Sequence, residues 1–167
     1  MTASYDFYDF QMDCYAFNEI AKKHNLTSLK DMELQYELIL EETKEIKDRG
    51  IDNNNVKEVL DGCIDVMVTA LGLMQKLEYL GIDVWTAMRD TAANNLSKFP
   101  KDEEEAAKTF NDYMNRGVPV DLQYNEEYQV FVVKNEQDKV MKPFSFKSND
   151  LSNCIPEELL NKGFETK

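Results

Sequence analysis

Residues suited to soft-metal sites and disulfides are scarce in this sequence. Its 167 residues include three cysteines, Cys14, Cys63 and Cys154, which are far apart, and one histidine, His24. A structural zinc site needs clustered Cys or His ligands, and a disulfide framework usually has an even number of cysteines. We therefore expect neither feature, and the unpaired cysteines favour a reducing compartment, the cytoplasm.

Long apolar runs and basic residues are also scarce. No stretch approaches the roughly 18 apolar residues of a membrane span, and no basic segment with an apolar run marks a signal peptide, so we expect neither. Lys and Arg number 19 against 32 Asp and Glu, which gives a net charge of −13. A surface this acidic repels phosphate backbones, so duplex DNA or RNA is a poor candidate partner.

Apolar residues, in contrast, make up 43% of the sequence, which is enough for one core. Most of them recur at helical spacing. Near the N-terminus, Phe7, Phe10, Cys14, Phe17 and Ala21 predict one apolar helix face. Capping residues and glycine or proline stops divide the pattern into further helices, with Gly50 as the stop of the second. The predicted helices cover about residues 4–23, 28–48, 56–80, 84–99 and 102–117.

After Pro119 the sequence becomes β-branched and aromatic. Residues 128–133 predict one strand and residues 140–146 a weaker one, with turn residues 135–138 between them, which is the pattern of a β-hairpin. A short helix is predicted after Pro156. The fold class is therefore mainly α, with a helical domain over residues 1–117 and a β-hairpin and tail extension over residues 118–167.

Two acidic residues lie on the apolar face of the second predicted helix. Leu34, Leu38, Glu42 and Glu45 fall on one stripe, so both glutamates continue a face that should pack against a neighbour. A carboxylate in such a place is costly unless it is paired or binds a metal.

The third predicted helix repeats this anomaly. From residue 59 to 74 its charged residues are Asp61 and Asp65, which share a face in a stretch so apolar that we expect it to be largely buried. One such acid is usually in a salt bridge, but two pairs with few inward basic residues favour an all-oxygen cage for Mg²⁺ or Mn²⁺. A di-iron centre would need Glu-x-x-His motifs, and His24 lies in a predicted loop, more consistent with a surface residue than with a catalyst.

These acidic segments resemble motifs of one family. Residues 40–46 resemble the Glu-Glu-x-x-Glu segment of MazG-like and phosphoribosyl-ATP pyrophosphohydrolase-like proteins, the all-α NTP pyrophosphatase superfamily, and residues 61–68 resemble its second acidic helix. Residues 81–83 and 95–99 are similar to a region of phage-type members. The resemblance covers roughly residues 5–100 and departs at Gly62, where the family has a glutamate, and at Asn94.

The resemblance implies a helical bundle of the all-α NTP pyrophosphatase type and a Mg²⁺-dependent hydrolase, with Mn²⁺ as an alternative. Such an enzyme cleaves a (d)NTP to a (d)NMP and pyrophosphate and so controls a nucleotide pool. The implied metal ligands are Glu42, Glu45, Asp61 and Asp65.

Further roles follow from the same resemblance. Glu41 or Glu42 would orient or deprotonate the attacking water. Lys98 would contact phosphate oxygens, and Asn95 would bind sugar, base or phosphate. Phe17 on the first helix is a weaker candidate for stacking on the base, since such aromatic residues more often pack in a core.

The missing glutamate at position 62 needs a substitute, and we expect Asp61 rather than Glu58. Asp61 lies one turn before Asp65 and is expected to be deep, beside Leu60 and Ile64. Glu58 is two turns from Asp65, about 10 Å along the helix axis, which is far for a shared ion.

Two other functions fit parts of the pattern. The same site could hydrolyse phosphoribosyl-ATP, although the hairpin tail gives that substrate no support. A non-enzymatic acidic helical interaction protein would carry its acids outside, whereas Glu42 and Asp65 are predicted inside. Because the third helix is apolar nearly all round, we also expect a homodimer or homotetramer, and the resemblance implies the same.

Overall fold

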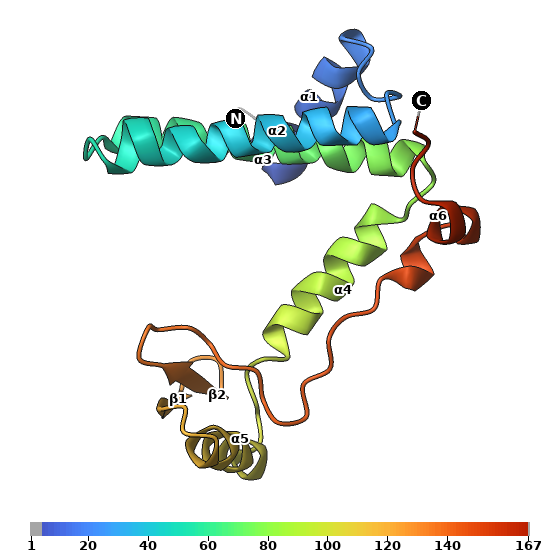
Figure 1. The fold of residues 1–167 in the computed structure, drawn as a ribbon. Helices are drawn as coiled ribbons and strands as arrows, with labels where there is room; N and C mark the ends of the chain where they lie inside the picture. Colours follow the sequence, from blue (N-terminus) through green and yellow to red (C-terminus); the bar gives the residue numbers. More distant parts are fainter. Residues whose placement is uncertain (1–4, 167) are drawn as a thin grey trace. The chain divides into compact units, whose positions relative to one another are not determined.

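The computed structural model describes residues 5–166 and confirms a mainly helical fold with a small two-stranded antiparallel sheet. The chain forms two compact units, residues 1–84 with 152–167, and residues 85–151. The ribbon in Figure 1 shows the elements of both units. Within the described part of the chain, no helix combines the length and apolar character needed to cross a membrane.

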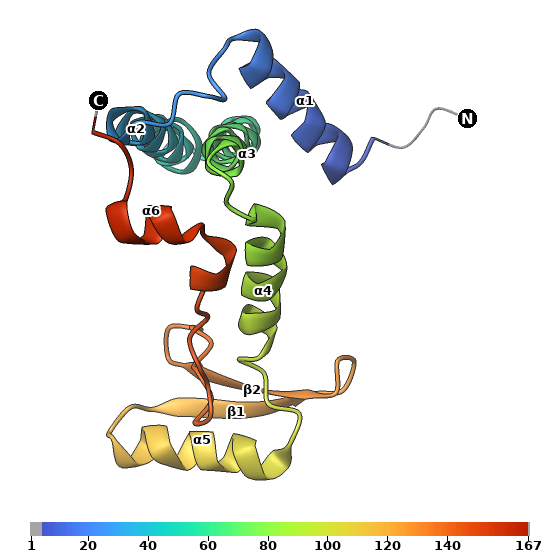
Figure 2. The same ribbon diagram turned by 90° about the vertical axis from the view of Figure 1, so that its right-hand side faces the viewer.

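Three helices make up most of the first unit, α1 (Phe7–Ile20), α2 (Leu29–Glu45) and α3 (Val56–Tyr79). Each begins at a side chain that satisfies free amide groups of its first turn. Asp6 and Ser28 form capping boxes, and Asn55 Oδ1 accepts from Lys57 N at 3.1 Å. Helices α2 and α3 run side by side, which is clearest in the end-on view of Figure 2.

The end of α2 differs from its prediction. Instead of stopping near Gly50, the helix continues as a π-helix, η1 (Ile46–Ile51), and Gly50 is buried inside it. A Cβ on Gly50 would lie 2.6 Å from Val59 Cγ2, and one on Gly62 would lie 2.7 Å from Ile46 Cγ1. Both distances are too short for real carbon atoms, so the two glycines allow η1 and α3 to pack closely.

The core of this unit is partly polar. Cys14, Tyr15 and Leu71 form its apolar cluster, while Gln11 and Gln75 are 1% and 6% exposed. Lys76 is buried too, and its Nζ donates to the carbonyl oxygens of residues 23 and 26, both at 2.8 Å, which closes the loop between α1 and α2. The pairing of these buried groups is incomplete: Gln75 Nε2 donates to Tyr15 O at 3.2 Å, but among residues 5–166 Gln11 Nε2 and Gln75 Oε1 have no hydrogen-bond partner.

Two burial predictions are wrong. The buried face of α1 is rotated from the predicted one, because Phe7 and Phe17 are 52% and 59% exposed. Helix α3 is not largely buried along its first half, where Leu60 and Ile64 are 64% and 40% exposed. In a single chain α3 is covered by α1 and α2 only in part, so an apolar sequence does not ensure burial there.

The tail returns to the first unit. A 3₁₀ turn, η2 (Ser152–Cys154), precedes α6 (Glu157–Lys162), which confirms the short helix predicted after Pro156. Asp83 N donates to Cys154 O at 2.9 Å, and Leu29 N donates to Glu165 O. These bonds attach the tail to the ends of α2 and α3.

The second unit holds α4 (Val84–Leu96), which starts at the boundary between the units, and α5 (Glu103–Asn115). Asp102 caps α5 as predicted, because its Oδ1 accepts from Glu104 N at 2.6 Å. Three glutamates follow in the first turn, where the helix dipole favours negative charge.

The sheet of this unit consists of β1 (Val120–Asn125) and β2 (Val130–Asn135). The predicted strand at 128–133 therefore exists but has a different partner from the predicted one. Residues 140–146 do not form a strand and contribute a single bridge, between Lys134 and Val140. The alternating sequence of residues 120–125 was the missed signal, and the turn at 126–129 joins it to β2.

One face of the sheet is covered by α5, as Figure 2 shows. Val133 on that face is 1% exposed. Residues 142–145 lie against α5 as well, because Phe144 N donates to Thr109 Oγ1 at 2.9 Å and Ser145 N to Glu105 Oε1 at 2.8 Å. A two-stranded sheet is marginal alone, and this packing stabilises it.

Candidate metal centre

Glu42 on α2 and Asp65 on α3 approach each other across the contact between these helices. Both carboxylates are half-buried. Burial raises the pKa of Glu42 above its ordinary value of 4.5, and the negative charge of Asp65 is the next largest cause. The pKa is raised further by Glu45 and Glu41 and lowered by Arg49. Two of the predicted carboxylates are therefore brought together, with Glu45 close enough to raise the pKa of Glu42.

Close packing fixes the position of this pair along the helices. Toward η1, Ile46 lies against Gly62. Toward the other end, Gln35 Nε2 donates to Thr69 O at 2.9 Å. Glu42 lies between Gln35 of α2 and Ile46 at the start of η1, and Asp65 lies between Gly62 and Thr69 on α3. The helix register therefore sets the two carboxylates opposite each other.

Glu45 is half-buried but has a partner that the sequence analysis missed. Its Oε2 accepts from Arg49 Nη1 at 2.7 Å, in an ion pair in which the arginine side chain is 62% exposed. The signal was present, because residues 45 and 49 have the i,i+4 spacing of a helical ion pair. An exposed pair of this kind contributes little to stability and can exchange for another partner. Glu41, the other glutamate of the motif, is exposed to solvent.

Asp61 is exposed, so its predicted deep position is wrong. Its neighbours Leu60 and Ile64 are exposed as well. Asp61 and Asp65 still share a face one turn apart, on a helix that is continuous through both positions. Glu58 is half-buried.

Gly62 itself is explained by the structure. Its α-carbon faces Ile46, and a glutamate there would have its Cβ within 2.7 Å of Ile46 Cγ1. The position at which the resembling family has a carboxylate is here a point of close helix contact, so any third ligand must come from another position.

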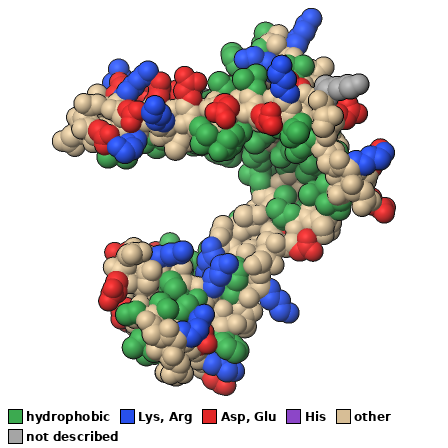
Figure 3. Space-filling view, in the orientation of Figure 1, with side chains coloured by type: hydrophobic (Ala, Val, Ile, Leu, Met, Phe, Trp, Pro, Cys, Tyr) green, Lys and Arg blue, Asp and Glu red, His purple; other side chains and the backbone are tan. Residues whose placement is uncertain are grey.

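The carboxylates do not form a complete cage. Among residues 5–166, no three Asp, Glu, His or Cys side chains are gathered so that they could hold a metal ion. The donor chemistry nevertheless suits a hard cation, since carboxylate oxygens are the ligands that Mg²⁺ prefers. Figure 3 shows acidic side chains spread among hydrophobic ones along the α2 and α3 pair.

The remaining predicted site residues belong to segments of the chain other than α2 and α3. Lys98 and Asn95 belong to the second unit, where Lys98 Nζ donates to Asn95 Oδ1 at 2.7 Å. Phe17 lies on the exposed side of α1, with Lys23 Nζ 5.9 Å from its ring centroid. His24 is in a loop, as predicted, and is half-buried with its ring edge-on to Tyr79, so the surface position expected for it is only partly right.

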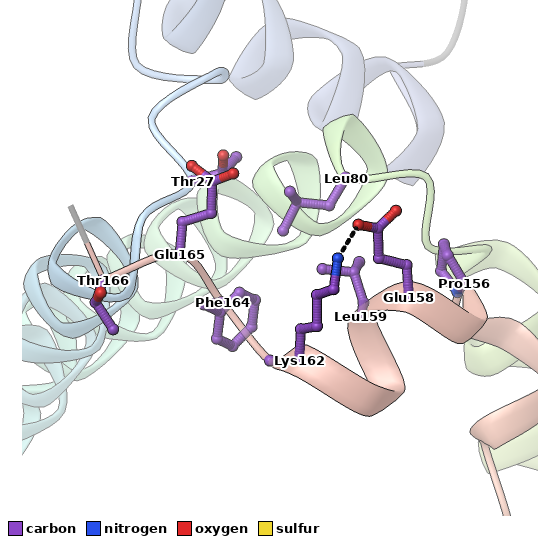
Figure 4. A pocket seen from close by; sticks show the side chains of 10 residues that line it. Thr27, Leu80, Pro156, Glu158, Leu159, Lys162, Phe164, Glu165 and Thr166 are labelled. Atoms are coloured by element: carbon purple, nitrogen blue, oxygen red, sulfur yellow. Dashed lines mark hydrogen bonds and ion pairs between the residues drawn. The ribbon is translucent and has the colours of Figure 1, made fainter.

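A separate hollow of about 610 Å³ lies in the first unit between α6, the tail and the end of α3. Figure 4 shows apolar side chains, Leu80, Leu159 and Phe164 among them, together with charged ones. Glu158 and Lys162, one turn apart on α6, form an ion pair of 2.7 Å and neutralise each other. Nothing in this hollow resembles a metal site.

Comparison with protein-family models, with curated proteins and with solved structures found no match to this chain.

Proposed function

We propose that the chain is a Mg²⁺-dependent nucleotide pyrophosphohydrolase that cleaves a (d)NTP to a (d)NMP and pyrophosphate. The observation that carries this proposal is the half-buried Glu42 carboxylate with the like charges of Asp65 and Glu45 beside it. Concentrated negative charge at a helix contact is unfavourable for the protein alone. A divalent cation would turn the same arrangement into a favourable one.

The proposed Mg²⁺ site combines two carboxylates with fixed positions and two that are free to turn toward an ion. Glu42 and Asp65 are held by the packing of α2 on α3, while Glu45 can exchange its exposed partner Arg49 for an ion. Asp61 would reach the ion from the solvent side of α3. A bound Mg²⁺ would neutralise charge on the phosphates and lower the pKa of a water molecule.

The other roles rest on the resemblance and are proposed residue by residue. Glu41 or Glu42 would orient or deprotonate the water that attacks the α-phosphate. Lys98 would contact phosphate oxygens, Asn95 sugar, base or phosphate, and Phe17, less strongly, the base. The exposed ring of Phe17 supports this last role to the extent that stacking needs an accessible face.

We also propose that the protein is a homodimer or homotetramer. Several large apolar side chains of α2 and α3 face solvent in the single chain, among them Leu34 at 62% and Leu60 at 64% exposed. Apolar surface gathered on two adjacent helices is typical of an interface. Light scattering at micromolar concentration should therefore give a multiple of 19.4 kDa, and a stable monomer would contradict the proposal.

The experiment that tests the activity is a pyrophosphate-release assay over the common (d)NTPs, with Mg²⁺, with Mn²⁺ and with excess EDTA. We expect pyrophosphate from at least one substrate and no turnover in EDTA. Direct release of orthophosphate would show that a different bond is cut. Phosphoribosyl-ATP belongs in the same assay, because that substrate would use the same site.

An acidic interaction protein is the non-enzymatic alternative. It predicts no turnover and no effect of Mg²⁺ on thermal unfolding. The inward position of Glu42 favours the enzyme, because a carboxylate meant for a protein partner gains nothing from being half-buried.

A further inference from the structure

The sheet of the second unit has one covered face and one open face. Directly paired residues of β1 and β2 share a face, and Val133, paired with Leu122, lies on the face under α5. Val130 and Val132 alternate with it and therefore lie on the opposite face. Both are only half-buried there.

A cavity of about 420 Å³ lies on this open face, and Val130 and Val132 are among its lining residues. Its other apolar lining comes from Phe99 and Leu96, beyond and at the end of α4, and from Tyr128 in the turn between the strands. All of these residues belong to the second unit. The volume is within the range of small-molecule sites, which are mostly apolar with a few placed polar groups.

Hydrogen bonds donated by backbone amides hold the lining in place. Phe131 N donates to Pro100 O at 2.7 Å, which fixes the segment between α4 and α5 beside β2. Asn125 Oδ1 accepts from Tyr128 N at 3.0 Å and shapes the turn that carries the tyrosine. The cavity therefore exists without a ligand, and binding would need little reorganisation.

The chemistry of the lining indicates what fits. Two aromatic rings, those of Phe99 and Tyr128, and two valines suit a planar ring. Lys101 is the charged residue of the lining, no acid lines the cavity, and within residues 5–166 Lys101 takes part in no ion pair. In a protein of net charge −13, an unpaired lysine beside an apolar surface favours an anion.

We propose that this cavity binds a small molecule that carries a planar aromatic ring and an anionic group. The ring would lie on Val130 and Val132, and the anionic group would pair with Lys101. The residues that line this site all belong to the second unit, and the proposal does not depend on the proposed hydrolysis.

The test uses 2-naphthoate as the probe and two-dimensional ¹H–¹⁵N spectra of the full-length protein as the readout. We expect saturable shifts of the Val130 and Val132 amides, smaller affinity for the neutral analogue 2-naphthalenemethanol, and no shifts with acetate. Shifts that do not saturate, or that spread over the exposed apolar residues of the whole chain, would overturn the proposal.

Two variants separate the charge from the apolar surface. Lys101→Gln should weaken naphthoate binding about threefold or more and leave the neutral analogue unchanged, while the exposed Lys139→Gln should change neither. Val132→Thr keeps the shape and the strand preference but should weaken both probes, with the exposed Val56→Thr as its control. Equal naphthoate affinity in Lys101→Gln and the unchanged protein would refute the proposed role of the lysine.

Discussion

Two polar side chains of α2, Gln35 and Glu42, face α3, and they differ in how their polar atoms are satisfied. Gln35 Nε2 donates to Thr69 O at 2.9 Å, so a neutral group is satisfied by a backbone carbonyl. In contrast, the charged Glu42 lies half-buried beside Asp65 and Glu45, and burial first, then these like charges, raise its pKa. The comparison shows that buried polarity alone is not evidence of a site. What distinguishes Glu42 is like charge, which a cation can relieve and a backbone carbonyl cannot.

The strongest test of this difference is Glu42→Gln, which replaces the charged carboxylate with a neutral amide like that of Gln35. We expect Mg²⁺-dependent turnover to fall at least about a hundredfold, because the amide removes a metal-binding charge. The metal-free protein should unfold at a higher temperature, because a buried charge among like charges is gone. Pyrophosphate release and thermal unfolding with and without Mg²⁺ measure the two effects.

The matched control is Glu37→Gln, an exposed glutamate on the same helix. It should keep both turnover and the increase in unfolding temperature that Mg²⁺ gives to the unchanged protein. Full activity of Glu42→Gln would show that Glu42 belongs to a structural cluster and not to a metal site.

Each of these two positions has a glycine of α3 close by, Gly72 beside Gln35 and Gly62 beside Ile46, and replacing them provides the next test. Gly62→Ala should lower the free energy of unfolding by about 1–2 kcal/mol, because a Cβ would lie 2.7 Å from the stiff Ile46 side chain and this outweighs the helix preference of alanine. In contrast, a Cβ on Gly72 would lie 3.1 Å from Gln35 Nε2, the end of a flexible side chain.

Gly72→Ala should therefore change stability by less than about 1 kcal/mol, since the glutamine can shift and alanine favours the helix. Urea unfolding of both variants measures the comparison. Equal stability of the two would mean that α3 shifts freely against η1, and the register that sets Glu42 opposite Asp65 would then be loose.

Much of the helical part of the fold could be predicted, because its signals are local. Ser28, Asn55 and Asp102 cap helices through atoms within three residues of themselves. The sheet was only half predicted, because a strand does not specify its partner. Residues 128–133 could pair with a segment on either side, and packing against α5 selects residues 120–125.

The candidate site shows a similar limit. Spacing placed Glu42 and Asp65 on inward faces, which the burial of both carboxylates supports. Spacing could not give the depth of Asp61, because an apolar helix is buried only where neighbours cover it. It also could not show that α2 continues into a π-helix over residues 46–51.

The two candidates for a further ligand give the third test. Asp61→Asn should lower Mg²⁺-dependent turnover about tenfold without affecting stability, because Asp61 is exposed and shares a face with Asp65. Glu58→Gln should leave most of the activity, because Glu58 lies about 10 Å from Asp65 along the helix. Metal titration of turnover measures both variants, and the opposite result would show that the second acidic motif was aligned wrongly.

The smallest effect expected is the pH dependence of metal-free stability. A carboxyl group whose pKa is raised on folding binds its proton more tightly in the folded state, so it destabilises the protein increasingly as pH rises from 4.5 through the raised value. The advantage of Glu42→Gln over the unchanged protein should therefore vanish below pH 4.5 and grow as pH rises through the raised pKa. Asp31 has the opposite sign, because the Ser28 hydroxyl lowers its pKa, but both proteins share it and it cancels in the difference. Thermal unfolding of the pair in EDTA across this range gives the measurement, with Gln35→Glu as the converse variant. Placing a carboxylate at position 35 should create the same kind of pH dependence, and if it does not, burial at the helix contact is not what raises the pKa of Glu42.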